Sequence, residues 1–349
     1  MPKKISVQGL IFLILIIALL IIFLLDLGLG SVSIPVHEVV NILLGQQPEK
    51  ITHSHIILKF RLPKALTATL AGAALGVSGL QMQTLFKNPL AGPFILGISS
   101  GASLGVALAV LTASVTTPTI LSDLGIISDF GLVVAASVGA GSVLGVMLVV
   151  SHRVKDTMTL LILGLLFGYA TSGIVSILLQ FATTERIQSY IMWTFGSFAG
   201  VTWKQLNVLI PVIVISLLIA LSQSKSLNAL LLGESYARSV GLTVQKTRFS
   251  LIASASILAG GITAFCGPIA FLGVAIPHLC RSLFNTSDHR ILIPSVIILG
   301  AILALIADLF SQLAIKEMVL PLNAITALIG TPVVTWVILR RNSRKSFPS

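Results

Sequence analysis

Long uncharged apolar runs recur along nearly the whole chain and constrain its fold more than any other feature. About 20 apolar residues in a helix suffice to cross a bilayer. Because backbone groups in lipid must pair within their own segment, the runs predict helices rather than open sheets. The sequence therefore predicts an all-α polytopic membrane protein in a single domain over residues 1–349. We expect ten spans, near 7–27, 61–82, 93–111, 130–150, 158–181, 207–222, 246–265, 268–283, 291–313 and 323–339.

The composition agrees, with 55% hydrophobic residues, 9% charged residues and a mean hydropathy of +1.04. A net charge of +11 would raise the question of nucleic acid in a soluble protein. Here the basic residues stand between and beyond the apolar runs, so they are topology signals. The first run, Val7 to Leu25, is longer than a signal-peptide core and shows no small-residue cleavage site, so we expect an uncleaved first span.

The placement of lysine and arginine predicts the orientation. With the N-terminus inside, fifteen basic residues fall in inner segments and seven in outer ones, which accounts for all 22. The positive-inside rule then puts both termini, and residues 226–242 between two spans, on the cytoplasmic face. The seven outer residues are Lys50, Lys59, Arg61, Lys64, Arg186, Lys204 and Lys316.

Motifs for catalysis and metal binding are missing from the sequence. There is no G-x-x-x-x-G-K-[ST] phosphate loop, and the His37 stretch "HEVVN" lacks the second histidine of a zinc motif. Cys266 and Cys280 match no zinc or redox spacing, so we interpret them as buried, inert thiols. His53 and His55 without a third ligand read as solvated loop residues. We therefore predict no catalytic residue, metal site or cofactor.

Asp308 is the one acid well inside an apolar stretch. Ionisable residues within membranes are functional candidates by default. Near the end of its span, however, the carboxylate can also simply reach water or a neighbouring backbone. Both readings stay open at this point.

Small and polar residues in the first third of the chain predict close helix packing. Glycines spaced by about four residues lie on one helical face and let backbones approach. Glutamine and asparagine side chains between these spans should face protein or a watery path, because lipid would leave them unpaired. The glycines are Gly72, Gly76, Gly79, Gly97, Gly101 and Gly105, and the amides are Gln81, Gln83 and Asn88. "GPFILG" from Gly92 and "GPIAFLG" from Gly267 suggest an inverted repeat.

The stretch "LLLGESYARSVGL", residues 230–242, is charged enough to stand out. Gly233 and Gly241 bracket about two helical turns, and Glu234 and Arg238 have the spacing of a weak helix-stabilising pair. So short a helix is marginal in water by itself and needs a surface to pack on. Tyr236, Ala237 and Val240 could provide apolar contacts. An ordinary amphipathic loop lying on the membrane is the simpler alternative.

Several stretches resemble the FecCD-type permeases of ABC importers for iron-siderophores, haem or vitamin B12. The resemblance is carried by "RLPKALTATLAGAALGVSGLQMQTLFKNPLAGPFILGISSGASLG" (61–105), by 230–242, and by "GPIAFLGVAIPHLCRSL" (267–283), "ADLFSQL" (307–313) and "LPLNAITALIGTPVVTWVIL" (320–339). It implies a permease homodimer in the cytoplasmic (inner) membrane of a bacterium. It also implies a separate ATP-binding cassette subunit and an external substrate-binding protein, and the permease itself would be no enzyme.

The resemblance also implies residue roles. Residues Gly233, Glu234, Ser235, Tyr236, Ala237, Arg238, Val240 and Gly241 would form a helix that couples the spans to the ATPase. Asn88, Leu90, Thr157 and Met158 match inner-gate positions. Arg61 and Lys64, with Lys316 in place of a basic residue that is Gln312 here, would meet acidic groups of the binding protein. The alternatives are a secondary transporter driven by an ion gradient, for which Asp308 is the one candidate ion-site residue, and an ion channel, for which no carbonyl or charged ring is evident.

Overall fold

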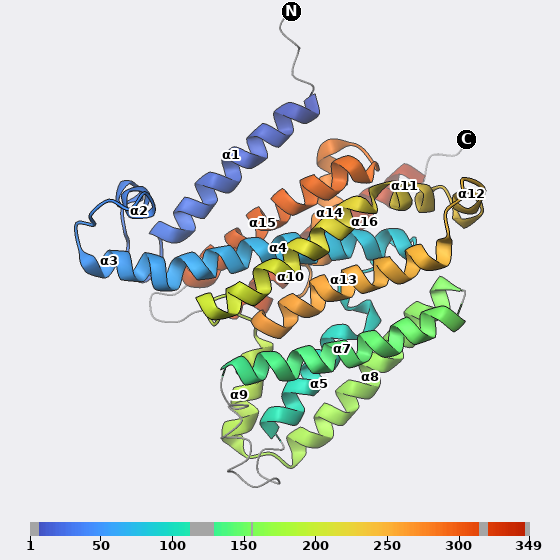
Figure 1. Cartoon of the computed structure of the whole chain (residues 1–349), viewed down its shortest axis with the longest axis horizontal. Coiled ribbons are helices and arrows are strands. Elements are labelled where there is room, and N and C mark those ends of the chain that lie inside the picture. The colour runs from blue at the N-terminus through green and yellow to red at the C-terminus, as the bar shows by residue number, and fades with distance from the viewer. Residues whose placement is uncertain (1–6, 112–128, 155, 314–319, 346–349) are drawn as a thin grey trace, which may run out of the picture.

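The structure, a computed structural model, describes residues 7–111, 129–154, 156–313 and 320–345, and these residues form helices and loops without a strand (Figure 1). The elements of the first half are α1 (Val7–Gly28), α2 (Val36–Leu43), α3 (Ile51–His55), the π-helical η1 (Ile56–Arg61), α4 (Leu62–Leu85), the 3₁₀ turn η2 (Pro93–Leu96), α5 (Ile98–Leu111), α7 (Asp129–Arg153) and α8 (Thr157–Gln180). The second half holds α9 (Thr184–Thr194), α10 (Trp203–Ser222), α11 (Ser224–Leu231), α12 (Glu234–Ser239), α13 (Val244–Cys266), α14 (Leu272–Phe284), α15 (His289–Leu313) and α16 (Leu322–Lys345).

All ten predicted spans are helices. Seven described helices are long and apolar enough to cross a bilayer, and the shorter apolar helices 98–111, 272–284 and 322–336 bring the number to ten. The prediction of an all-α multi-pass protein is therefore confirmed. The orientation of the termini stays a prediction.

Helix α4 occupies the centre of the bundle (Figure 1). It packs against α13, α14 and α15, and nearly all of its residues are buried. A second group, α5, α7, α8 and α9, lies to one side of these helices and meets them through α13. The α1 helix lies against α15, and most of its apolar surface is exposed. An apolar exterior of this kind is stable in lipid rather than in water.

The glycines on α4 explain how the centre packs so closely. A Cβ atom on Gly72 would lie 1.9 Å from the Gly300 carbonyl oxygen of α15. One on Gly79 would lie 1.7 Å from the Gly273 carbonyl oxygen of α14. Small residues at such crossings let backbones touch, which drives helix association in lipid. The packing prediction is confirmed here and for Gly101 and Gly105, which meet α7.

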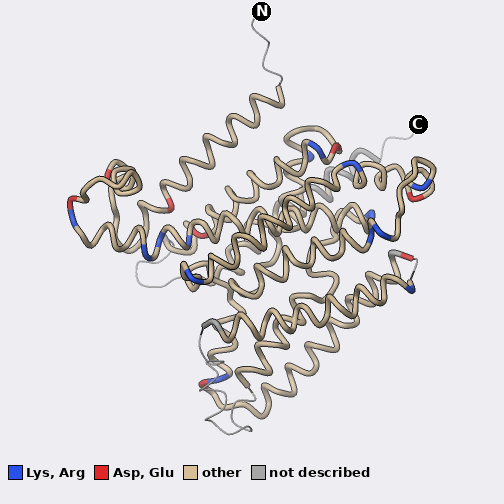
Figure 2. Tube along the Cα trace, viewed as in Figure 1, with Lys and Arg blue, Asp and Glu red and all other residues tan. Residues whose placement is uncertain are grey.

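Charged residues gather at the ends of the helices (Figure 2). One end holds α11, α12, the α7–α8 connection and the end of α4, and we refer to it as the coupling end. The other holds α2, α3 and the start of α4, and we refer to it as the opposite end. The buried amides lie between helices as predicted: Gln81 donates to Ser254 Oγ at 3.2 Å, and Gln83 donates to the Val274 carbonyl oxygen at 3.2 Å. Both cysteines are free and buried, which confirms that prediction.

Candidate coupling site

Helix α12 is a short helix at the coupling end whose inner face is anchored by one alanine. Ala237 is fully buried, whereas Tyr236 and Val240 are 47% and 56% exposed. Ser235 and Arg238 are also exposed. Glycines bracket the helix as predicted, Gly233 with φ +117° and Gly241 with φ +85°. The left-handed conformation at Gly241 ends the helix without strain. The helix therefore turns most of its surface outward.

The carboxylate of Glu234 on α12 forms its shorter ion pair with a residue that sequence spacing did not indicate. Arg238 Nη2 lies 3.5 Å from Glu234 Oε2, the predicted pair, but Arg248 Nη2 of α13 donates to Glu234 Oε1 at 2.8 Å. The Arg248 side chain is 6% exposed and that of Arg238 is 67% exposed. The shorter, better buried bond is the stronger of the two, because water competes less for it. Glu234 thus joins α12 to α13 rather than only to its own helix.

The predicted gate residue Met158 lies at the start of α8, which begins at Thr157. Asp156 precedes this helix and accepts hydrogen bonds from Thr159 N at 2.8 Å and Thr159 Oγ1 at 2.6 Å, an N-cap arrangement. These bonds from Thr159 hold the pKa of the exposed Asp156 carboxyl below its usual value. The Met158 side chain is 57% exposed. The Asp156 cap therefore fixes the first turn of α8, while the Met158 side chain on this turn stays exposed and can make contacts.

The other predicted gate residues, Asn88 and Leu90, lie in the turn that follows α4. Asn88 Oδ1 accepts from Leu90 N at 2.9 Å, and Leu90 is 45% exposed. The carbonyl oxygen of Pro89, between them, lies 2.7 Å from His278 Nε2 of α14. This loop is therefore held both by its own asparagine and by a neighbouring helix.

One cavity lies between α12, the end of α4 and the α7–α8 connection. It has a volume of about 290 Å³ and is lined by the end of α4, by Asp156 and by Glu234 and Arg248. The complete lining is Thr84, Leu85, Lys87, Asp156, Leu230, Glu234, Val244 and Arg248. Residues far apart in the sequence thus share one space at the coupling end.

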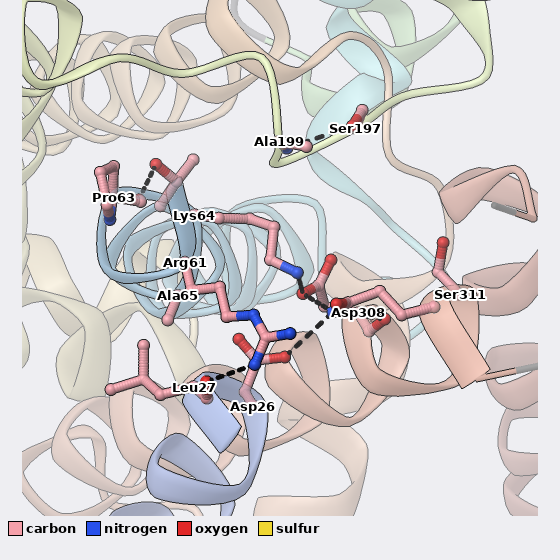
Figure 3. A network of polar contacts seen from close by, with 12 residues as sticks. Asp26, Leu27, Arg61, Pro63, Lys64, Ala65, Ser197, Ala199, Asp308 and Ser311 are labelled. Carbon is pink, nitrogen blue, oxygen red and sulfur yellow. Dashed lines mark hydrogen bonds and ion pairs between the residues drawn. The ribbon is translucent and has the colours of Figure 1, made fainter. Parts of the chain in front are cut away.

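A buried charge cluster at the opposite end corrects one interpretation of the sequence (Figure 3). Lys64 Nζ lies 2.8 Å from Asp308 Oδ2, so Asp308 reaches neither water nor backbone as one reading proposed but forms an ion pair. Gln312 Nε2 donates to Asp308 Oδ2 at 2.7 Å and to Asp26 Oδ1 at 3.3 Å. The cluster therefore fastens α1, α4 and α15 to one another.

Arg61 and Lys64 do not lie on an open rim in this chain. Their exposed fractions are 6% and 8%. Arg61 Nη1 donates to the carbonyl oxygens of Leu27 at 2.8 Å and Gly28 at 2.9 Å, and Nη2 donates to Val32 O. These side chains turn inward because a buried cation needs acceptors close by. Docking of a binding protein on Arg61 and Lys64 stays a prediction that would require them to leave these partners, and Lys316 lies outside the described residues.

Of the two histidines predicted to be solvated, His55 is exposed as expected, but His53 is not. His53 Nδ1 lies 2.8 Å from Glu38 Oε2, and the Glu38 side chain is 2% exposed, so this histidine links α3 to α2. Among the described residues there is no group of three or more His, Cys, Asp or Glu side chains placed to hold a metal.

Fold and site together define a multi-pass helical membrane protein that presents a short loop-borne helix at one end of its bundle. The chain belongs to the FecCD transport family, whose model matches residues 18–340. The vitamin B12 import system permease protein BtuC of Klebsiella pneumoniae is 36% identical over 288 residues, which cover 82% of this chain and 83% of that protein. The protein of the same name from Citrobacter koseri is 36% identical over 81% of this chain and 83% of its own.

A solved structure resembles the whole bundle. It is an inward-facing ABC transporter described as being of the metal-chelate type, and it superimposes with a TM-score of 0.82 at 28% identity. The match covers 95% of this chain and 99% of the other. Together with these bacterial relatives, the seven long apolar helices make the chain a multi-pass protein of the bacterial inner membrane.

Proposed function

We propose that the chain is the permease subunit of a binding-protein-dependent ABC importer. A second copy of the chain, a cytoplasmic ATPase subunit and an extracytoplasmic binding protein complete the transporter. The observation that carries the proposal is α12, a six-residue helix with one buried alanine and an outward surface of Ser235, Tyr236 and Val240. A helix this short has little stability of its own, so a partner that packs on its exposed side fits its design.

We infer that the substrate is a metal chelate, namely a cobalamin, an iron-siderophore or haem. Support comes from the relatives, which are named for vitamin B12 import, and from the structural neighbour of the metal-chelate type. An ATP-driven mechanism is favoured over an ion-gradient carrier, since Asp308 is engaged by Lys64 rather than left open for a coupling ion. ATP hydrolysis belongs to the partner subunit, and the permease carries no catalytic residue.

Reconstitution tests this function. The chain would be incorporated into vesicles with its ATPase and binding-protein subunits, with ATP inside the compartment that the ATPase faces. Uptake of cobalamin, a ferric siderophore and haem would be measured in parallel arms. We expect uptake of one class that requires both ATP and the binding protein. Uptake that follows an imposed proton or sodium gradient without ATP would contradict the proposal.

A further inference from the structure

Two chains of hydrogen bonds start from the segment 226–242 and end at two different places of the coupling end, the α7–α8 connection and the last turn of α4. Each passes through a buried basic residue contributed by a different long helix. Neither chain was indicated by sequence spacing, because the participating residues lie far apart along the chain.

The first chain runs through Arg248 on α13. Its Nη2 donates to Glu234 Oε1 of α12 at 2.8 Å, and its Nη1 donates to the Val154 carbonyl oxygen at 3.3 Å. Val154 lies in the connection between α7 and α8, three residues before Thr157. Arg248 is 5% exposed, so these bonds are shielded from water. One guanidinium group therefore ties the short helix to the residue that directly follows α7, in the α7–α8 connection.

The second chain runs through His289, the first residue of α15. Its Nδ1 lies 2.8 Å from Asn228 Oδ1 of α11, and its Nε2 lies 2.9 Å from Thr84 Oγ1, two residues before the turn that follows α4. Asn228 Nδ2 donates to Asp288 Oδ1 at 2.6 Å. That bond fixes the orientation of the amide, so Oδ1 is the acceptor and His289 Nδ1 carries a proton. His289 is 1% exposed and Thr84 is 2% exposed.

Space beside these chains permits movement. Arg248 lines two cavities, the one of about 290 Å³ shared with Thr84 and Asp156 and another of about 390 Å³. The second is bounded by His152 and Val154 on the α7 side and by Arg238 and Gln245 on the other. A residue bonded on both sides yet bordered by open volume can shift with its partners, whereas a fully packed one resists displacement.

We propose that Arg248 and His289 are positioning residues that transmit movement of the segment 226–242 to two neighbouring sites, Arg248 to the α7–α8 connection and His289 to the last turn of α4. The inference rests on the proposed function and assigns the path by which the ATPase partner reaches the gate. Each link is charge-assisted or buried, so displacement of α11 and α12 pulls both sites together. A single movement of the segment 226–242 then shifts both of these sites.

The test uses the reconstituted complex and measures substrate transported per ATP hydrolysed. Arg248→Met keeps length but cannot donate, and His289→Phe keeps a ring but loses both ring nitrogens. Lys246→Met and Arg290→Met are matched controls, since both residues are exposed neighbours of the relay residues. We expect normal ATPase binding and hydrolysis in all four, with the transport ratio reduced roughly tenfold in the two relay variants, as is typical of lost coupling between sites, and unchanged in the controls.

Further variants cover the case in which the buried substitutions prevent folding. Glu234→Gln and Thr84→Val alter the partners without emptying a buried site, and they should also reduce the ratio. A wild-type ratio of substrate transported to ATP hydrolysed in all the folded variants would overturn this inference but not the proposed function. A defect confined to ATPase binding would do the same. A wild-type complex that shows no ATP-driven uptake would overturn the proposed function, and the inference with it.

Discussion

Lys64 and Asp308 form a buried ion pair, with Nζ 2.8 Å from Oδ2, that joins α4 to α15 at the opposite end of the bundle. The side chains are 10% and 7% exposed. Asp26 and Arg61 lie beside the pair (Figure 3), so the cluster contains two acids and two bases. Removing a single member leaves a buried charge without compensation, which costs more than removing the whole pair.

Lys64→Met should therefore destabilise the purified protein by about 3–5 kcal/mol. The double variant Lys64→Met/Asp308→Leu should recover most of that loss, because it restores the balance of charge. Thermal unfolding in detergent measures the difference, with the exposed Lys59→Met as a control. If the double variant is as unstable as Lys64→Met, the pair does not carry the stability assigned to it.

Gly79→Ala should prevent normal packing of α4 on α14. The new Cβ atom would lie 1.7 Å from the Gly273 carbonyl oxygen, and backbone cannot rotate away as a side chain can. We expect a loss of at least about 3 kcal/mol, the upper end for overpacked cores. Gly141→Ala on α7 is the control, since nothing lies within 4 Å of its Cβ position. It should be neutral or stabilise by about 0.5–1 kcal/mol, as alanine does within helices. The yield of folded protein and the unfolding temperature would be measured for both variants. Equal values for Gly79→Ala and Gly141→Ala would contradict the close contact of Gly79 with Gly273.

Ala237→Pro should uncouple transport without unfolding the spans. Proline removes the hydrogen bond from Ala237 N to the Gly233 carbonyl oxygen, which is 2.9 Å long, and within a helix it costs about 3 kcal/mol. The spans keep their own backbone bonds. We expect normal insertion with lost uptake, through weaker ATPase binding or futile hydrolysis. Wild-type uptake by Ala237→Pro, or its failure to fold, would speak against a coupling role.

Residues at the two ends of the bundle should lie on different sides of the membrane. A cysteine at Gln47 should react with an impermeant thiol reagent in intact cells, whereas one at Ser239 should react only after the cells are opened. Both positions are exposed, and the native Cys266 and Cys280 are buried, so background labelling is low. The charge asymmetry motivates this expectation. The reverse labelling pattern would invert the orientation.

The sequence by itself determined the class of fold and the position of the helices. Lipid allows a spanning segment few alternatives to a helix, so an uncharged run defines its own structure without reference to the rest of the chain. The glycines of α4 and the bracketed stretch around Ala237 were likewise identified from local spacing. Such features depend on residues within a few turns of one another.

Only the tertiary structure decided the partners of the charged residues. Glu234 lies four residues from Arg238, yet its shorter bond goes to Arg248, which is fourteen residues away and buried. Lys64 and Asp308 lie on different helices that meet because glycine lets their backbones touch, as at Gly72 and Gly300. A buried charge takes whichever opposite charge or acceptor packing brings within reach, because lipid and protein interior offer no water instead. That choice depends on how the helices cross, which periodicity along the chain does not specify.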